Sequence, residues 1–263
     1  MKVMSYNTLF AGFDGGDNRR FAAQLELITG INPDILLLQE AKNFTANGAS
    51  LLFEMEKCIK MRGFIAPAPH TGQNTGIFIK GDIEPITAEI DSTHFHHAIM
   101  ILKVNVPGFV KHVTLISAHL CPFGPHIRLR EVSYLINHAA ANELTLLAGD
   151  FNSVSPYDRE PQVGELLSHF RARYVKPDGS IDNSVMAVLY QAGYVDIAHK
   201  LGKHHIPTVP TASFKGAEFV PFRSDYILTT SAFSKYAKSY AVVQNDLTDY
   251  ASDHYPVIAE FSP

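Results

Sequence analysis

The stretch LLAGDFN, residues 146–152, places two polar side chains directly after a run of apolar residues. The segment 144–148 has the continuous hydrophobicity of a strand that is buried on both faces, and Asp150 and Asn152 follow it at once. A carboxylate beside core strands is costly unless a cation or hydrogen bonds compensate it. The stretch therefore predicts a core strand that ends at a polar site.

Five more apolar segments carry polar residues at one end. They are VMSYN (3–7) before Asn7, ILLLQE (35–40) before Glu40, LISAHL (115–120) around His119, SDYILTT (224–230) with Asp225, and SDHYPVIAEF (252–261) with Asp253 and His254. One such junction can arise by chance. Six of them predict that these side chains meet at a single site.

Most of these residues, taken alone, also have a structural explanation. An acid after a strand often caps a helix or turn, as Glu40 would, and Asp150 with Asn152 can form an Asx turn. A lone His119 is more often a hydrogen-bonded histidine of the core. The pair Asp253–His254, which precedes a strand led by proline, has no structural task that needs both residues.

The residue types of the six junctions favour one kind of ion. Carboxylate and amide oxygens without thiolates suit a hard cation such as Mg²⁺ or Mn²⁺ better than a structural zinc. His119 and His254 can supply hydrogen bonds or protons near neutral pH. A hard cation, a carboxylate base and imidazoles together indicate metal-assisted hydrolysis of a phosphate ester.

The composition excludes several classes of protein. The 263 residues are 46% hydrophobic and only 18% charged, with 28 Phe and Tyr, which rules out a disordered chain. No uncharged stretch is apolar enough to span a bilayer. The net charge of −4 argues against a generic nucleic-acid binder. We expect a single domain over residues 1–263.

The N-terminal residues and the cysteines indicate the cellular location that we expect for the protein. The first ten residues lack the apolar run and the cleavage site of a secretory signal and already resemble a strand. Cys58 and Cys121 stand in apolar surroundings, far apart, and form no CxxC motif. We expect both to be reduced packing residues of a cytoplasmic protein.

The hydrophobic pattern predicts strands and helices that alternate and then give way to consecutive strands. We expect strands at 3–6, 35–38, 144–148, 226–229, 240–243 and 256–261, four or five strands between 75 and 119, and helices after Asp17 or Asn18, at 50–61, at 127–141 and around 185–192. This order favours an α/β (α+β) fold in which two packed sheets are covered by helices.

The six motifs also carry a resemblance to a known family. They are SYNT (5–8), LLLQE (36–40), SAHL (117–120), GDFN (149–152), RSDYIL (223–228) and SDHYPV (252–257). In this order they resemble the endonuclease/exonuclease/phosphatase superfamily, which includes DNase I-like nucleases, abasic-site endonucleases, inositol polyphosphate 5-phosphatases, neutral sphingomyelinases and deadenylases. The resemblance implies a four-layer α/β sandwich in which two mixed β-sheets pack face to face, flanked by helices, with the site at one rim.

The resemblance also implies a metal site that binds Mg²⁺ or Mn²⁺. In enzymes of this family the glutamate of LQE is the main metal ligand, which implies that role for Glu40. Asn7 would support the metal or the phosphate, and Asp253 would lie near the metal.

The remaining motif residues would act on the phosphate. By the same resemblance Asp150 orients or deprotonates the attacking water, and Asn152 binds a nonbridging oxygen. His254 would contact the scissile phosphate and be oriented by Asp225. His119 stands where abasic-site endonucleases carry a tyrosine, which speaks against that activity. We expect in-line attack by water without a covalent enzyme intermediate.

Contacts to the rest of the substrate are harder to assign. Candidates are Arg19, Arg20, Arg128, Arg130, Tyr157 and Arg223. For the arginines a solvated helix face or, in Arg223, a surface ion pair with Asp225 is an equally simple explanation. The segment 208–222, rich in Pro, Phe and Thr, is typical of a specificity loop and predicts the apolar lip of a pocket.

The cluster of His94, His96 and His97 invites a zinc hypothesis. In a strand, His94 and His96 would lie on one face and His97 on the other, so three ligands would not converge. We therefore expect a surface or partly exposed strand here rather than a metal site.

The sequence leads to a divalent-metal phosphodiesterase or phosphatase that acts on a small or compact phosphate ester. The alternative within the family is an endo- or exonuclease that acts on DNA or RNA, with a short nucleic acid as substrate. From another class, the chain could be an inactive family member that serves as a binding module. The absence of GxSxG argues against a serine hydrolase, and no obligate protein partner is evident.

Overall fold

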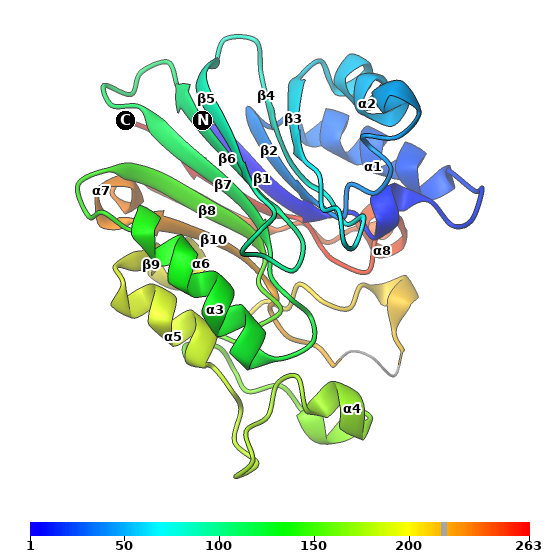
Figure 1. Ribbon diagram of the computed structural model, residues 1–263, viewed down its shortest axis with the longest axis vertical. Coiled ribbons are helices and arrows are strands. Elements are labelled where there is room, and N and C mark those ends of the chain that lie inside the picture. Colours follow the sequence, from blue (N-terminus) through cyan, green and yellow to red (C-terminus); the bar gives the residue numbers. More distant parts are fainter. Residues whose placement is uncertain (217–219) are drawn as a thin grey trace.

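Two six-stranded mixed β-sheets pack face to face, with helices on their outer faces (Figure 1). The computed structural model describes residues 1–216 and 220–263. The strand order is β11-β12-β1-β2-β4-β3 in the first sheet and β5-β6-β7-β8-β10-β9 in the second. This arrangement confirms the predicted four-layer α/β sandwich.

The elements of each layer have the following bounds. The first sheet comprises β1 (Lys2–Asn7), β2 (Ile35–Gln39), β3 (Arg62–Ala66), β4 (Thr75–Ile79), β11 (Ala237–Val242) and β12 (Val257–Phe261). The second comprises β5 (Glu84–Asp91), β6 (Ile99–Asn105), β7 (Val113–His119), β8 (Leu144–Asp150), β9 (Tyr194–Asp196) and β10 (Asp225–Thr230). The α-helices are α1 (Arg19–Ile31), α2 (Ser50–Ile59), α3 (Pro125–Leu135), α4 (Ser168–Arg171), α5 (Ser184–Gln191), α6 (Ile197–Lys200), α7 (Ser231–Ser234) and α8 (Asp246–Ala251).

The alternation of side chains along each strand sorts the core into layers. In β1, Val3 faces the other sheet and belongs to the central core, whereas Met4 packs with Phe21 of α1 on the outer side. In the second sheet Leu147 packs outward against Val132 of α3. The central strands of each sheet are therefore buried on both faces, which explains why β2 and β8 are almost continuously apolar.

The sequence missed the elements whose patterns are weakest. The edge strand β3 is mostly half-buried and lacks a clean alternation, and β9 has only three residues. The helix expected at 127–141 covers Pro125–Leu135 and ends in a 3-10 turn at Ile136–His138. The helix expected to reach residue 61 ends at Ile59, because Lys60 adopts a left-handed φ of 55°.

The prediction of a strand at residues 94–97 is wrong. These residues lie in the connection between β5 and β6. The Asp91 carboxylate accepts hydrogen bonds from the backbone N–H groups of Thr93 and His94, at 3.0 Å each, and so turns the chain at the end of β5.

No helix among the described residues is long and apolar enough to cross a membrane. Cys58 is exposed, Cys121 is buried, and both are free thiols.

Candidate active site

The register of three strands in the second sheet brings polar side chains together. Asp150, the last residue of β8, pairs with His119 on the parallel strand β7 and with Asp225 on the antiparallel strand β10. Gly149 makes the close pairing possible, because a Cβ atom there would lie 1.8 Å from the carbonyl oxygen of Ala118. Its φ of 148° is also one that side chains rarely adopt.

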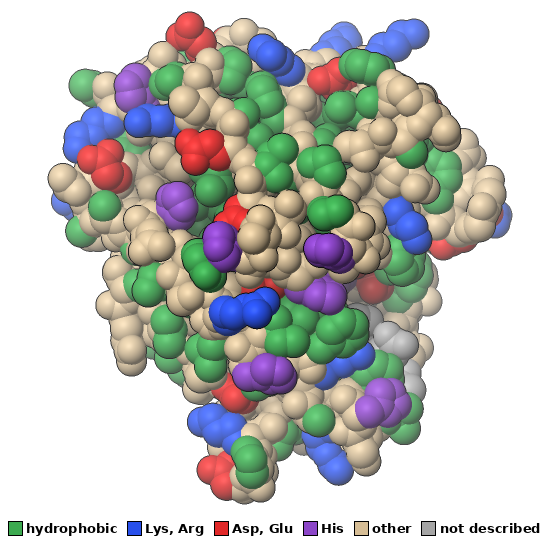
Figure 2. All heavy atoms as spheres, viewed as in Figure 1, with side chains coloured by type: hydrophobic (Ala, Val, Ile, Leu, Met, Phe, Trp, Pro, Cys, Tyr) green, Lys and Arg blue, Asp and Glu red, His purple; other side chains and the backbone are tan. Residues whose placement is uncertain are grey.

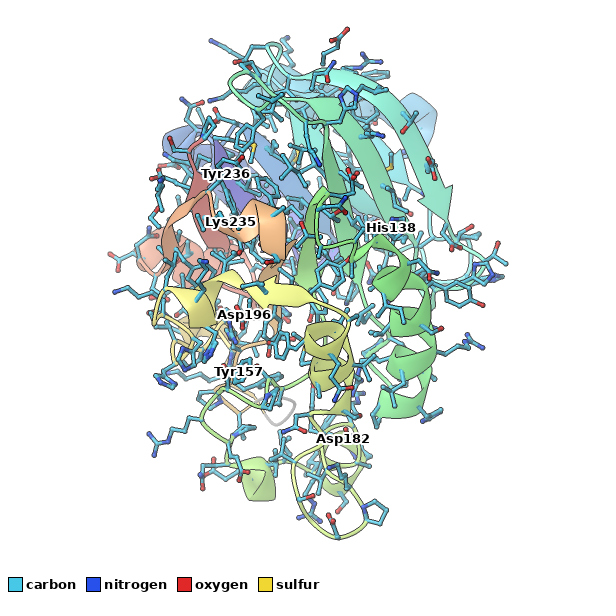
Figure 3. The ribbon with its side chains drawn as sticks, turned by 90° about the vertical axis from the view of Figure 1, so that its left-hand side faces the viewer. His138, Tyr157, Asp182, Asp196, Lys235 and Tyr236 are labelled. Carbon is cyan, nitrogen blue, oxygen red and sulfur yellow. The ribbon has the colours of Figure 1, made fainter. Side chains whose placement is uncertain are left out.

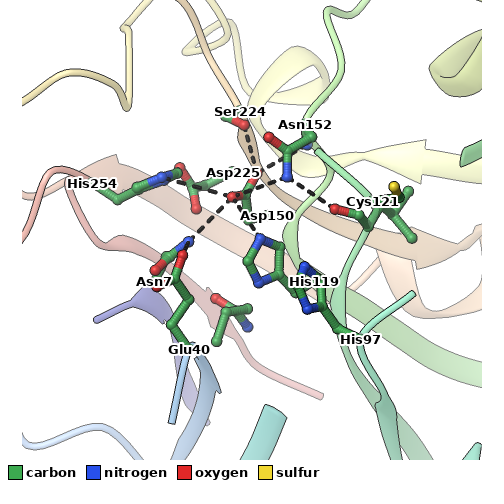
Figure 4. Close-up of polar contacts among 12 residues, drawn as sticks. Asn7, Glu40, His97, His119, Cys121, Asp150, Asn152, Ser224, Asp225 and His254 are labelled. Carbon is green, nitrogen blue, oxygen red and sulfur yellow. Dashed lines mark hydrogen bonds and ion pairs between the residues drawn. The ribbon is translucent and has the colours of Figure 1, made fainter. Parts of the chain in front are cut away.

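The first sheet contributes two residues from neighbouring parallel strands. Asn7 ends β1, and Glu40 follows β2. The Asn7 amide nitrogen lies 3.4 Å from Glu40 Oε1 and 3.2 Å from Asp150 Oδ2 of the other sheet (Figure 4). The Asn7 oxygen accepts from the N–H of Leu9 at 3.1 Å. Asn7 therefore joins the two sheet edges by donating to both carboxylates.

Two of the polar side chains extend from unfavourable backbone conformations. Glu40 has a φ of 57° and Asn152 a φ of 48°, in the left-handed region. The N–H of Phe10 donates to Glu40 Oε2 at 3.0 Å. The Asn152 amide donates to the carbonyl of Leu120 at 2.9 Å. Such conformations persist only where surrounding contacts enforce them, and they concentrate at functional sites.

Asp150 is buried at the centre of the cluster and is held in its ionised form. Its Oδ1 accepts from Ser224 Oγ at 2.6 Å and from the N–H of Asn152 at 2.9 Å. Its Oδ2 lies 3.4 Å from His119 Nε2 and 3.7 Å from His254 Nε2. Burial alone would raise the pKa of Asp150, but the two imidazoles and the two hydrogen bonds outweigh it and lower the pKa.

His254 lies between two carboxylates. Its Nδ1 is 2.8 Å from Asp225 Oδ2, and its Nε2 faces Asp150. Burial would lower the pKa of His254, but Asp225, Asp150 and Asp253 raise it well above its usual value. Burial raises the pKa of Asp225. The geometry therefore keeps His254 as an oriented hydrogen-bond donor.

The C-terminal motif is tied to the first strand through a serine. Ser252 Oγ donates to the carbonyl of Asn7 at 2.7 Å and lies 3.3 Å from Asp253 Oδ1. The N–H of His254 donates to the same Ser252 oxygen at 3.3 Å. This serine holds Asp253 and His254 at the edge where β1 ends.

The oxygen donors at this edge fit a hard divalent cation. Asp150, Asp225 and His254 offer ligand atoms that all lie within 4.8 Å of one another. However, His254 Nδ1 is already bonded to Asp225, whereas Asp225 Oδ1 is buried without a hydrogen-bond partner among the described residues. Glu40 is half-buried and presents its carboxylate beside Asn7. Carboxylate oxygens without a thiolate are the donor set that Mg²⁺ or Mn²⁺ prefers.

His97 belongs to the site, although the sequence did not place it there. Its ring stacks on His119 with centroids 4.2 Å apart and planes at 22°. Its Nδ1 lies 2.9 Å from Thr71 Oγ1. Burial, His119 and His96 lower the pKa of His97 to about 2, so the ring is neutral. The histidine cluster was visible in the sequence, but no local signal joins it to His119.

Three of the candidate substrate-binding arginines are buried and bonded to the protein. Arg20 pairs with Asp14 at 2.7 Å. Arg128 donates to two backbone carbonyls, those of Cys121 and Arg173. Arg223 does not pair with Asp225 on the surface but lies in the interior, where it binds the carboxylates described next. These guanidinium groups support the loops around the site, and a substrate would have to break their contacts to reach them.

Arg223 binds two buried carboxylates. It contacts Asp158 at 2.7 Å and Asp196 at 2.6 Å. Nearby, Tyr157 is 43% exposed and its ring stacks on His199 at 3.9 Å. Figure 3 shows Tyr157 and Asp196 on the same side of the molecule.

The other two candidate arginines are exposed, and part of the predicted lip lies next to Arg223. Arg19 pairs with Asp17 on the surface, and Arg130 is exposed on α3. A cavity of about 460 Å³ lies next to Arg223. Part of its wall is formed by Phe222, the last residue of the predicted lip 208–222, and by Pro207, which directly precedes the lip. Residues 217–219 of that segment lie outside the described residues.

The two packed mixed sheets, with a polar cluster at one edge of both, define the DNase I-like class of folds. The sequence profile of the Endonuclease/Exonuclease/phosphatase family matches residues 4–254, and the chain belongs to this family. A search of the curated proteins found no match.

Solved structures share the fold at low sequence identity. An AP endonuclease from Archaeoglobus fulgidus has a TM-score of 0.72 at 18% identity, with 100% of both chains covered. D. rerio TDP2 complexed with single-strand DNA product has a TM-score of 0.68 at 18% identity, and the mannosyl-6-phosphatase Bt3783 of Bacteroides thetaiotaomicron VPI-5482 has 0.69 at 16%. In both, 100% of this chain and 99% of the other are covered. These similarities confirm the fold.

Proposed function

We propose that this protein hydrolyses a phosphodiester or phosphomonoester with the help of Mg²⁺ or Mn²⁺. One observation carries the proposal: the ionised, buried carboxylate of Asp150 is surrounded by His119, His254 and Asn7, with Glu40 beside Asn7. A carboxylate base, imidazole donors and an oxygen-lined metal position are the groups that in-line attack by water on phosphorus requires.

Each residue has a proposed part in the reaction. Glu40 would hold the cation, with Asn7 and Asp253 supporting that position from β1 and the C-terminal motif. When bound, the cation would neutralise charge on the phosphate oxygens. Asp150 would accept the proton of the attacking water or orient that water.

The hydrogen-bond donors of the site would stabilise the phosphate in the transition state. His254, oriented by Asp225, would donate to a phosphate oxygen. Asn152 and His119 would contact further oxygens. His119 Nε2 lies 3.4 Å from Asp150 Oδ2, which places this imidazole beside the proposed base.

A nuclease activity is the second candidate. The solved structures of similar fold include a TDP2 complexed with single-strand DNA product and an AP endonuclease, alongside a mannosyl-6-phosphatase. His119, in the position where abasic-site endonucleases carry tyrosine, argues against that particular activity. An inactive binding module is disfavoured, because all residues of the six motifs are present.

A panel of phosphate esters, assayed with and without added Mg²⁺, tests the proposal. The panel should contain nucleic acids, nucleotides, phosphoinositides, sphingomyelin and a bis-aryl phosphate. We expect hydrolysis of at least one ester that stops in chelator, returns with Mg²⁺ or Mn²⁺, and is lost in Glu40→Gln. Glu54→Gln, a change of an exposed glutamate on α2, is the matched control. Hydrolysis that continues unchanged in chelator would disprove the metal dependence, and a protein that neither hydrolyses any ester nor binds a metal would support the inactive module.

A further inference from the structure

A row of four aromatic rings leads from Asp150 to the surface. His119 faces the Asp150 carboxylate, His97 stacks on His119 at 4.2 Å, and His96 meets His97 edge-on at 4.8 Å. Phe123 then meets His96 at 5.1 Å. Exposure rises along the row, from 4% for His119 and 5% for His97 to 60% for Phe123. The row therefore begins at the reacting centre and ends in an exposed apolar ring.

The row is held rigidly by a buried acid. The Glu131 carboxylate of α3 is fully buried and accepts from the N–H of His96 at 2.7 Å and from the N–H of Cys121 at 2.9 Å. These two backbone groups belong to the two loops that carry the histidines and Phe123. A single side chain thus fixes both loops relative to each other.

The outer end of the row combines an exposed ring with a cation. The guanidinium of Arg173 lies 6.0 Å from the centroid of the Phe123 ring and 4.6 Å from that of Phe170. Figure 2 shows histidine side chains gathered in the middle of this face, next to hydrophobic and basic side chains. Exposed rings interleaved with basic groups are the means by which proteins stack the bases of single-stranded nucleic acids.

A similar pair stands on the other sheet. Phe10 follows β1 and is 40% exposed, and Lys42 Nζ lies 4.7 Å from its ring centroid. Phe10 also donates its backbone N–H to Glu40 Oε2 at 3.0 Å, so its backbone adjoins the proposed metal position. An exposed aromatic ring with a nearby cation thus follows a strand of each sheet, Phe10 after β1 and Phe123 after β7.

We propose that Phe123, with Arg173, is a specificity-determining subsite that stacks a base of a nucleotide-containing substrate whose scissile phosphate lies at Asp150. This inference rests on the proposed phosphoesterase function and names its substrate class as single-stranded nucleic acid or a nucleotide ester. A base presents a flat π-face to the ring, which a sugar phosphate lacks. A base in duplex has both faces covered by its neighbours, so the strand must be single or frayed at the site.

Binding of fluorescent oligothymidylate tests the subsite without relying on turnover. Phe123→Ala should weaken binding about tenfold or more, within the range measured for loss of one base–aromatic stack, and Phe123→Trp should restore it. Phe53→Ala is the matched control, because Phe53 is also 60% exposed but lies on α2. An oligomer with abasic residues should bind Phe123→Ala and wild type within twofold of each other.

The two sources of the base are separated by comparing substrates. If the oligomer and a dinucleotide lose affinity equally in Phe123→Ala, a nucleotide ester suffices; a larger loss for the oligomer favours an extended strand. Unchanged oligomer binding in Phe123→Ala, or an equal loss for the abasic oligomer, would overturn the subsite. Hydrolysis of other phosphate esters by a protein that binds no oligomer would also overturn it, while leaving the proposed function intact. If oligomer binding depends on Phe123 but no ester is hydrolysed, the subsite stands and the proposed catalysis fails.

Discussion

The substitution Asp150→Asn removes one charge from the middle of the site while preserving the shape of the side chain. The wild-type Oδ1 accepts from Ser224 and from the N–H of Asn152, and an asparagine oxygen can keep both bonds. The wild-type Oδ2 instead faces nitrogen atoms of Asn7, His119 and His254. An asparagine NH₂ in that position is itself a hydrogen-bond donor, so it could not accept hydrogen bonds from these nitrogen atoms.

The expected loss of stability is smaller than the expected rise in the activation barrier of the reaction. One buried group left without its partner costs about 1–3 kcal/mol, which lowers the Tm of a domain of this size by roughly 2–4 °C per kcal/mol. Loss of a general base typically lowers turnover by about 10²–10⁴-fold, which corresponds to about 2.7–5.4 kcal/mol in the barrier. The variant should therefore remain folded at 25 °C and lose at least about a hundredfold in kcat.

The assay is hydrolysis of bis(p-nitrophenyl) phosphate with saturating Mg²⁺ or Mn²⁺, with thermal unfolding measured on the same samples. Asp82→Asn makes the same chemical change at an exposed position and should leave both readouts within error. If Asp150→Asn is folded at the assay temperature and keeps more than a tenth of wild-type kcat, Asp150 does not prepare the nucleophile.

Three further predictions concern the scaffold of the site. Gly149→Ala should destabilise the protein by more than about 3 kcal/mol, beyond the usual range for overpacking, because the new methyl group would meet the carbonyl of Ala118. Denaturant unfolding measures this loss, with Gly81→Ala as the exposed control. Equal unfolding free energies for the two variants would contradict the prediction. Arg223→Met should cost about 3–5 kcal/mol, since it leaves buried carboxylates unpaired, and a Tm equal to wild type would refute its structural role. His97 has a pKa of about 2 in the folded state and of about 6.5 when unfolded, so the unfolded chain binds the extra proton and stability is lost as the pH falls below about 6.5. By pH 5 this loss is about 2 kcal/mol; His97→Phe should remove it, and an unchanged difference in unfolding free energy between pH 7.5 and pH 5 would show that the ring is not held neutral.

The sequence predicted the central strands because they are buried on both faces. The segments around Leu37 and Leu147 are continuously apolar, and this pattern does not depend on which strands are their neighbours. Edge strands lack that pattern: β3 is half-exposed, and β9 is only three residues long. The connection at His94–His97 was predicted as a strand, because the turn made by the Asp91 carboxylate depends on side-chain geometry that the alternation of residues does not reveal.

The motif residues of the candidate site were also visible in the sequence. Buried strands that end in Asn7, Asp150 or a neighbouring acid are costly without a compensating partner, so their repetition pointed to one shared site. The structure brings Asn7 to within hydrogen-bonding distance of both Glu40 and Asp150, across two sheets.

By itself the sequence determined which strands are buried and which polar residues stand at their ends, because both are set by the local order of apolar and polar side chains. Only the tertiary structure decided which partner each polar residue has. His97 stacks on His119, and Arg223 binds Asp158 and Asp196 rather than the neighbouring Asp225. Such pairs join residues far apart in the chain, and they follow from strand register and loop packing, which leave no local pattern in the sequence.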